Sequence, residues 1–115
     1  MHTRRLINQT KNTVISENVC MATSLSQRAK GLLGKARMEK GEALVIDPCN
    51  SIHTFFMRFP IDVLFVSKDH VIVKTVTAIK PFRLKAAAAA SYVVELPAGT
   101  ALLTSCEAGD SLRLE

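Results

Sequence analysis

The chain has 115 residues, of which 48% are hydrophobic and 22% charged, a composition typical of one folded domain rather than of a disordered protein. The formal net charge of +5 suits an anionic partner, and no apolar run approaches the roughly 20 residues that cross a bilayer. The three cysteines are widely separated and form no C-x-x-C pair, which excludes a disulfide framework and a zinc knuckle.

The N-terminal third predicts a strand followed by a short helix. Residues 14–22 mix β-branched and polar side chains, and Ser24 or Ser26 can cap the helix that comes next. We expect this helix to end near Gly34. The side chains expected to point inward are Leu25, Ala29, Leu32 and Leu33. No apolar segment follows the basic start of the chain, so no secretory signal is expected and the chain as given is predicted to be cytoplasmic.

The central part of the chain predicts three strands. Residues 41–48 form a short apolar segment bounded by glycine and proline. Residues 61–66 and 71–76 are two further apolar runs, separated by the polar tetrapeptide SKDH at residues 67–70. This strand, turn, strand pattern indicates an antiparallel hairpin.

The C-terminal third predicts shorter elements. Residues 85–91 contain five consecutive alanines, and we expect a short helix or an ordered loop there, because five residues are too few to hold a helix alone. Residues 92–96 predict a strand, residues 100–105 a single helical turn, and residues 111–114 a final strand after a turn.

Together these elements predict an α+β, mainly β fold in a single domain that covers residues 1–115. Several short strands and one or two short helices favour a small, curled or closed, largely antiparallel β-sheet, because closure of a sheet protects the edges of its strands. No internal repeat and no linker divides the chain.

The stretch HTFFMRFPIDVLF, residues 53–65, places charged side chains inside an apolar run. In an extended conformation both of its faces would carry large apolar groups, so any charge there must be paired, hydrogen-bonded or placed at a cleft. Pro60 divides the stretch in two, because proline cannot donate a backbone hydrogen bond. The candidate ligand-binding residues are His53, Thr54, Arg58 and Asp62.

Two interpretations of these four residues remain open. In the first, Arg58 and Asp62 form an ion pair that only shapes the fold, while His53 and Thr54 hydrogen-bond to backbone. In the second, Arg58 holds an anionic group, and His53 and Asp62 supply proton transfer or orientation. Cys49, four residues before His53, is interpreted as a core cysteine rather than a nucleophile.

Other chemical motifs are not found in the sequence. It contains no phosphate-binding glycine loop, no H-E-x-x-H metal motif and no G-x-S-x-G nucleophile elbow. We therefore expect no cofactor and no metal, and we assign no catalytic residue.

Two basic segments raise nucleic acid as an alternative partner. One contains Arg28, Lys30, Lys35, Arg37 and Lys40, and the other contains Lys74, Lys80, Arg83 and Lys85. No recognition motif accompanies them, and aromatic residues make up only 5% of the chain, so stacking on bases is not favoured. We interpret these segments as solvated charge that keeps a small domain soluble.

The central stretch resembles the hallmark of the DUF192 family, also called UPF0127, which runs H-T-F-x-M-R-F-x-I-D-V-x-F. Supporting matches are RAKGLLG at residues 28–34, VELPAG at residues 94–99 and the Gly-Asp pair at residues 109–110. The resemblance covers about residues 5–114. It implies a compact, mainly β prokaryotic domain with short helices, and it supplies no activity.

Two details of the resemblance bear on the expected cellular location and on the turn at residues 67–70. Many relatives carry an export signal, which leaves the cellular location open. His70 stands where the family usually has a glycine, so the resemblance questions the geometry of the turn at residues 67–70.

The sequence thus predicts a non-catalytic binding domain, whose cleft beside the HTFFMRFPID strand accepts a small polar or anionic ligand or a segment of a partner protein. The alternative is a small hydrolase-like enzyme that uses His53 and Asp62 as acid and base. A weaker alternative is a nucleic-acid-binding domain that uses the basic segments. The binding domain is preferred because the sequence shows no activated nucleophile.

Overall fold

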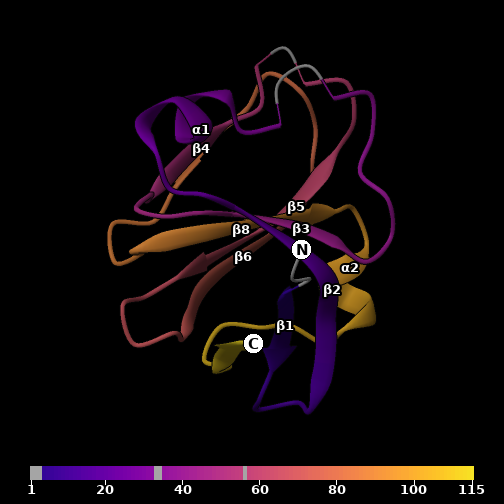
Figure 1. Cartoon of the computed structure of the whole chain (residues 1–115), viewed down its shortest axis with the longest axis vertical. Helices are drawn as coiled ribbons and strands as arrows, with labels where there is room; N and C mark the ends of the chain where they lie inside the picture. The colour runs from indigo at the N-terminus through magenta and orange to yellow at the C-terminus, as the bar shows by residue number, and fades with distance from the viewer. Residues whose placement is uncertain (1–3, 33–34, 56) are drawn as a thin grey trace.

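A seven-stranded mixed β-sheet forms the body of the protein (Figure 1). This computed structural model describes residues 4–32, 35–55 and 57–115. In spatial order the strands are β6 (Ile72–Ile79), β5 (Ile61–Val66), β8 (Tyr92–Pro97), β3 (Glu42–Ile46), β2 (Thr13–Ala22), β1 (Arg4–Asn8) and β9 (Leu112–Leu114). Strands β2 and β3 pair in parallel, and the other neighbouring pairs of described strands are antiparallel.

The two edges of this sheet meet at one end. Val71, just before β6, forms a β-bridge with Ser111, just before β9. The backbone N–H of Leu112 also donates to the carbonyl oxygen of His70 at 2.8 Å. The sheet is therefore curled into a half-barrel, which confirms the predicted mainly β, largely antiparallel and curled architecture.

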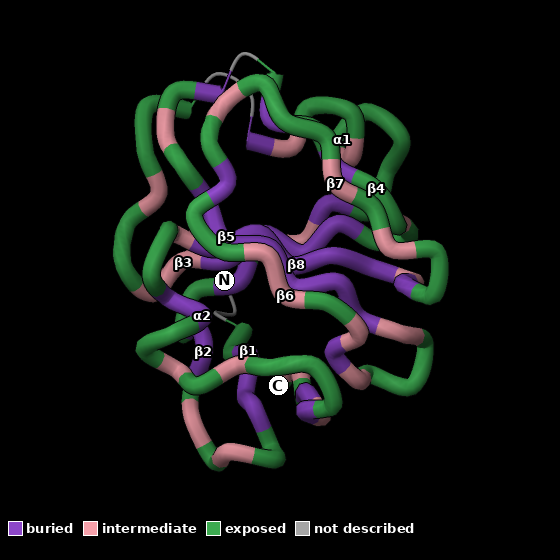
Figure 2. The backbone as a smooth tube through the Cα atoms, turned by 180° about the vertical axis from the view of Figure 1, so that it is seen from behind, coloured by how far each residue is buried: buried purple, intermediate pink, exposed green. Residues whose placement is uncertain are grey.

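Strand β5 lies at the centre of the core, since all six of its residues are buried. Its side chains alternate between two apolar clusters: Leu64 and Val66 enter one, whereas Ile61, Val63 and Phe65 enter the other. Each such fully buried side chain contributes about 1.5–3 kcal/mol relative to an exposed one. Figure 2 shows this buried centre in purple, with the exposed loops around it in green.

The predicted hairpin of β5 and β6 is confirmed. His70 in its turn has a positive φ of 65°, a conformation that glycine adopts more easily. The side chain of His70 holds the turn against the sheet, because its Nδ1 lies 2.9 Å from the hydroxyl oxygen of Tyr92 on β8. The hairpin therefore forms with a histidine rather than a glycine at this position.

A second, two-stranded antiparallel sheet stands apart from the main one. It pairs β4 (Ser51–His53) with β7 (Leu84–Ala86), and we refer to it as the ribbon. Strand β7 was not expected from the sequence, and the strand expected from His53 onward instead ends at His53. The alanines after β7 form an ordered turn, in which the N–H of Ala90 donates to the carbonyl oxygen of Ala87 at 3.0 Å. Of the two structures expected for residues 85–91, the loop is correct and the helix is wrong.

Two short helices complete the fold. Helix α1 (Leu25–Lys30) begins at Ser24, which forms a capping box with Gln27. It ends earlier than expected, at Gly31, and Leu25 and Ala29 are exposed, so their predicted inward orientation is wrong. Leu32 is buried as predicted, while Leu33 and Gly34 lie outside the described residues.

Helix α2 (Thr100–Leu103) lies within the helical turn expected at residues 100–105. Among the described residues, no helix is both long enough and apolar enough to pass through a bilayer.

The central stretch is not one continuous strand. Strand β4 ends at His53, strand β5 begins at Ile61, and the residues between them form a loop. Met57 is buried, whereas His53 and Phe55 are exposed, so these three side chains do not share one face as they would in an extended strand. The expected division of the stretch at Pro60 is confirmed, because β5 starts directly after it.

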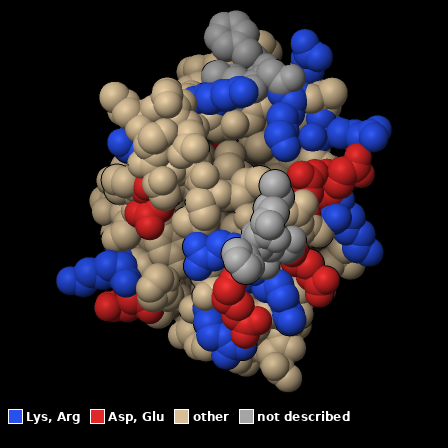
Figure 3. Space-filling view, viewed as in Figure 1, with Lys and Arg blue, Asp and Glu red and all other residues tan. Residues whose placement is uncertain are grey.

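The basic segments do not form continuous bands of free charge. Lys35 lies 3.8 Å from Glu42, and Arg37 lies 2.7 Å from Glu39. In the lower half of Figure 3, blue basic and red acidic side chains lie side by side, whereas blue ones are visible along its upper edge, with a red group below those on the right. Basic side chains thus gather at one end of this face.

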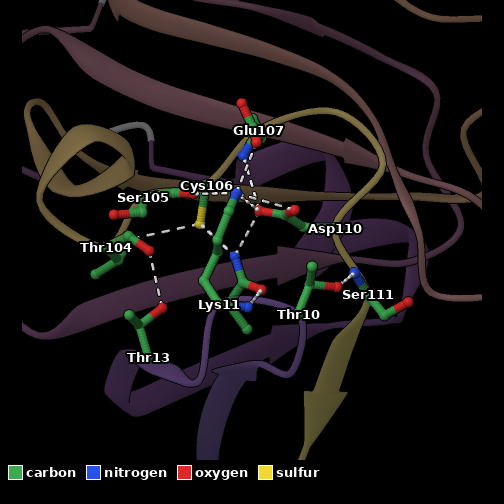
Figure 4. A network of polar contacts seen from close by, with 10 residues as sticks. Thr10, Lys11, Thr13, Thr104, Ser105, Cys106, Glu107, Asp110 and Ser111 are labelled. Carbon is green, nitrogen blue, oxygen red and sulfur yellow. Dashed lines mark hydrogen bonds and ion pairs between the residues drawn. The ribbon is translucent and has the colours of Figure 1, made fainter.

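A polar network joins the turn after β1 to the segment before β9 (Figure 4). The ammonium of Lys11 lies 3.0 Å from Asp110 Oδ2 and 2.8 Å from Glu107 Oε1. The side-chain amide of Asn8 donates to the same Asp110 oxygen at 2.9 Å. Because Asn8 and Asp110 are both buried, this network fixes the two ends of the described chain to each other.

Candidate functional site

Asp62 has a structural role inside the sheet. Its carboxylate is fully buried and accepts three backbone hydrogen bonds, from Ala78 at 2.8 Å, Gly99 at 3.0 Å and Ala101 at 2.9 Å. Gly99 precedes α2 and has no side chain to cap it, so the Asp62 carboxylate takes the place of an N-cap. The arrangement holds strand β6 and helix α2 against β5.

Thr54 is also fully buried, and it connects two loops. Its hydroxyl donates to the carbonyl oxygen of Lys80 at 2.7 Å and accepts from the N–H of Arg83 at 2.9 Å. Its own backbone accepts from Met57 at 3.2 Å and from Phe82 at 3.1 Å. Thr54 therefore fixes the loop before β7 onto the loop after β4.

His53 and Arg58 lie on the surface instead. The His53 ring stacks on Phe55, with centroids 5.3 Å apart and an angle of 23° between the planes. The ion pair between Arg58 and Asp62 is not formed, since backbone N–H groups occupy the Asp62 oxygens. The structure thus does not bring the four candidate residues together at one point.

A pocket of about 290 Å³ lies beside His53, between α1, β3, β4 and β8. Its apolar walls include Leu32, Ile46, Ile52 and Met57. Its polar lining includes Arg28, Lys30, Cys49, His53 and Glu95. A concave, mostly apolar site with a few converging polar groups is the usual form of a small-molecule site.

Glu95 is the most unusual group in this pocket. It projects from β8 and is only 5% exposed, and no described residue donates a hydrogen bond to its carboxylate or forms an ion pair with it. Burial raises the pKa of Glu95 to about 7. A Cβ at Gly31 would lie 3.9 Å from Glu95 Oε1, so the chain at the end of α1 passes close to this carboxylate.

Arg28 provides a complementary group from α1. One of its terminal nitrogens, Nη1, donates to the carbonyl oxygen of Pro48 at 3.2 Å, whereas its Nε is buried without a hydrogen-bond partner among the described residues. A buried donor left unpaired costs about 1–3 kcal/mol. The pocket therefore holds one acceptor and one donor that the fold does not use.

Cys49 lines the same pocket but does not have the character of a nucleophile. Its thiol donates to the carbonyl oxygen of Ser51 at 3.0 Å. Burial is the largest cause of the raised pKa of Cys49, which keeps the sulfur protonated at neutral pH. This agrees with its interpretation as a packed cysteine, although it is only partly buried against the core.

The search for a site in the central stretch alone missed Arg28 and Glu95. Glu95 did carry a signal, because it is the single charged residue in the apolar strand Tyr92–Pro97. Arg28 carried none, since an arginine on a short helix is usually solvated.

The comparisons with known proteins agree with this fold. The family model DUF192, described as "Uncharacterized ACR, COG1430", matches residues 6–114. A UPF0127 protein of Pyrococcus horikoshii is 36% identical over 94% of this chain and 96% of its own length. A UPF0127 protein of Thermococcus sibiricus is 30% identical over 96% of this chain and 74% of its own length.

Two solved structures are similar in fold. One is a protein of unknown function from Novosphingobium aromaticivorans, with a TM-score of 0.82 and 19% identity, covering 96% of this chain and 82% of that one. The other is a putative transcription regulator from Sinorhizobium meliloti, with a TM-score of 0.79 and 24% identity, covering 96% of this chain and 90% of that one. At these identities the likeness concerns the fold alone.

Proposed function

The chain belongs to the DUF192 family, and because the description of that family names no activity, we propose a function from the pocket itself: the protein binds a small molecule with an anionic head and an apolar body. One observation carries the proposal. The pocket holds a buried guanidinium N–H and a buried carboxylate that have no partners among the described protein groups, above apolar walls.

The lining of the pocket favours an anionic head. Arg28, Lys30 and His53 line it together with a single acid, Glu95. Because the pKa of Glu95 is raised to about 7, its carboxyl group is partly protonated at neutral pH and can donate a hydrogen bond to an anion. The guanidinium of Arg28 lines the same pocket and can donate a second, charge-assisted hydrogen bond through its terminal nitrogens.

The size of the pocket and its walls define the rest of the ligand. A volume of about 290 Å³ lies at the lower limit of typical small-molecule sites, which span roughly 300–1,000 Å³. Ile46, Ile52 and Met57 offer apolar surface and no further hydrogen bonds from their side chains. A short aliphatic or aromatic monocarboxylate fits this combination of size, charge and polarity.

The enzyme alternative has weaker support. It needs His53 and Asp62 to act together, but Asp62 does not line the pocket and its carboxylate is occupied by three backbone N–H groups. The protonated thiol of Cys49 does not supply an activated nucleophile either.

The proposal is tested by isothermal titration with matched pairs of probes: benzoate against benzamide, and hexanoate against hexanamide. We expect measurable binding of the carboxylates at pH 6 and none of the neutral amides. Arg28→Gln is expected to weaken carboxylate binding by about tenfold to a hundredfold, as expected for the loss of a hydrogen bond from a charged donor.

Arg113→Gln is the matched control, because Arg113 is exposed on β9, away from the residues that line the pocket. This variant is expected to bind the carboxylates as the unmodified protein does. Equal affinity for acid and amide, or undiminished binding by Arg28→Gln, would contradict an anion-binding pocket.

A further inference from the structure

Four large side chains gather on the surface where the ribbon meets its neighbouring loops. These residues, which we call the ribbon patch, are His53, Phe55, Phe82 and Leu84. Phe55, Phe82 and Leu84 are 41%, 61% and 67% exposed. The rings of Phe55 and Phe82 lie with centroids 6.3 Å apart, and His53 lies opposite Leu84 in the register of the ribbon. Exposed apolar residues of this size in one group indicate an interaction surface.

The ribbon patch is built on a firmly held backbone. The loops that carry Phe55 and Phe82 lie together at the top of Figure 1, drawn in pink and in orange. Fully buried Thr54 bonds to both of them through its hydroxyl and its backbone. Phe82 has a positive φ of 65°, which is unusual for a bulky side chain, and yet most of its side chain faces solvent. The fold thus presents this ring outward at a conformational cost.

The two segments that carry the ribbon patch contain basic residues and no acidic ones. These segments are residues 48–61 and 80–92, and neither contains an aspartate or a glutamate. Their basic residues are Arg58, Lys80 and Arg83, which are exposed, and Lys85, which lies opposite buried Ile52 on the other face of the ribbon. Blue side chains are also visible along the upper edge of Figure 3, with a red group below those on the right. The charge around the patch therefore complements an anionic partner.

We propose that the ribbon patch docks the protein on an anionic lipid surface, with Phe82, Leu84 and Phe55 entering the interface and Arg58, Lys80 and Arg83 contacting lipid headgroups. Exposed apolar side chains flanked by lysine and arginine are the combination that holds peripheral proteins at such surfaces. This inference is independent of the pocket, although His53 belongs to both.

The stacking of the rings favours lipid over single-stranded nucleic acid. A base needs an open ring face on which to stack, but the Phe55 ring already stacks on His53 and lies close to Phe82. Leu84 has no ring to offer. Insertion into a lipid interface requires apolar area and no particular ring face.

Vesicle co-sedimentation of the full chain tests the proposal. We expect binding to vesicles of phosphatidylcholine mixed with phosphatidylglycerol, no binding to vesicles of phosphatidylcholine alone, and weaker binding as salt is added. Arg83→Gln should weaken binding about fivefold, which corresponds to roughly one charge at an anionic surface.

The double variant Phe82→Asn, Leu84→Thr should abolish binding. Asparagine accepts a positive φ and threonine suits a strand, so the loop and the ribbon are expected to keep their conformation; an unchanged melting temperature checks this. The matched control is Leu102→Thr on α2, where the leucine is 83% exposed, and it should bind like the unmodified protein.

Three results would overturn the proposal: absence of binding to the anionic vesicles, equal loss in the Leu102→Thr control, or unchanged binding in the double variant. Binding of a single-stranded oligonucleotide that displaces the protein from vesicles and depends on Phe82 would also overturn it, because the patch would then serve nucleic acid.

Discussion

The guanidinium of Arg28 and the carboxylate of Glu95 line one pocket without forming an ion pair with each other. Opposite charges that line one pocket commonly pair, because a buried charge without a partner is costly. Here α1 carries one group and β8 carries the other, and both residues line the pocket. Four predictions about the fold and the pocket follow from individual contacts.

The first prediction concerns the pH dependence of stability. Below about pH 4.5 Glu95 is protonated in both the folded and the unfolded protein, so it does not affect the free energy of unfolding. As the pH rises toward 7, the unfolded state releases this proton while the folded state retains it, because burial raises the folded pKa to about 7. Stability therefore falls across this window by about 3 kcal/mol and stays level above it.

Urea unfolding at pH 5 and pH 8 measures this effect. In Glu95→Gln most of this decrease in the free energy of unfolding between pH 5 and pH 8 is expected to disappear. Glu17 is exposed, and Glu17→Gln should show the same decrease as the unmodified protein. An unchanged pH dependence in Glu95→Gln would show that this carboxylate is not the group responsible.

The second prediction concerns Asp62. In Asp62→Asn the side chain keeps one acceptor oxygen but turns an NH₂ group toward backbone N–H donors, so at least one of its three hydrogen bonds is lost. We expect a loss of about 2–4 kcal/mol in the free energy of unfolding. Asp69→Asn in the exposed β5–β6 turn should change it by less than about 0.5 kcal/mol. Similar values for both variants would contradict a structural role of the Asp62 carboxylate.

The third prediction concerns Thr54. Thr54→Val removes a hydroxyl that both donates to Lys80 and accepts from Arg83, and it is expected to cost about 1–3 kcal/mol. Amide exchange should accelerate at residues 80–83, since these contacts hold that loop. Thr54→Ser, which retains the hydroxyl, should preserve most of the protection; if it exchanges as fast as Thr54→Val, the hydroxyl is not what fixes the loop.

The fourth prediction concerns the space beside Glu95. A side chain at Gly31 would point toward Glu95 Oε1 and Ile46, and Gly31 has a positive φ of 49°. Gly31→Val should therefore strain the end of α1 and narrow the pocket. The resulting loss in the free energy of benzoate binding is expected to exceed the loss in the free energy of unfolding. Gly109→Val also replaces a glycine of positive φ but meets no atom within 4 Å, so it should lower stability without affecting benzoate binding.

The elements that the sequence predicted correctly are those with a strong local pattern. The β5–β6 hairpin consists of two apolar runs around one polar turn, and each run carries its own signal in consecutive residues. Strands β1, β4 and β7 are only three to five residues long. Strands β4 and β7 form by pairing with each other across a long stretch of chain, and β1 pairs with distant β9 as well as with neighbouring β2, so part of this pairing leaves no local pattern.

The site was harder to predict for a related reason. Asp62 accepts hydrogen bonds from backbone N–H groups, and the sequence does not indicate which backbone groups will lie near a side chain. Arg58 was therefore the only partner for Asp62 that the sequence suggested. Arg28 and Glu95 are 67 positions apart in the chain. They share a pocket because the fold places α1, which carries Arg28, beside the paired strands β3 and β8. The resemblance to DUF192 indicated the right segments but not their shared pocket.

The pairing of β1 with β9 also bears on how the chain folds. Asn8 and Asp110 are separated by 102 positions, so the loop closed by their contact spans nearly the whole chain, and such closure slows folding. During synthesis β1 is made long before β9, its partner on that side. Its outer edge therefore stays open until translation of this region is finished. Arg4 and Arg5 at the start of β1 are exposed, and charge at an open strand edge discourages pairing with another nascent chain.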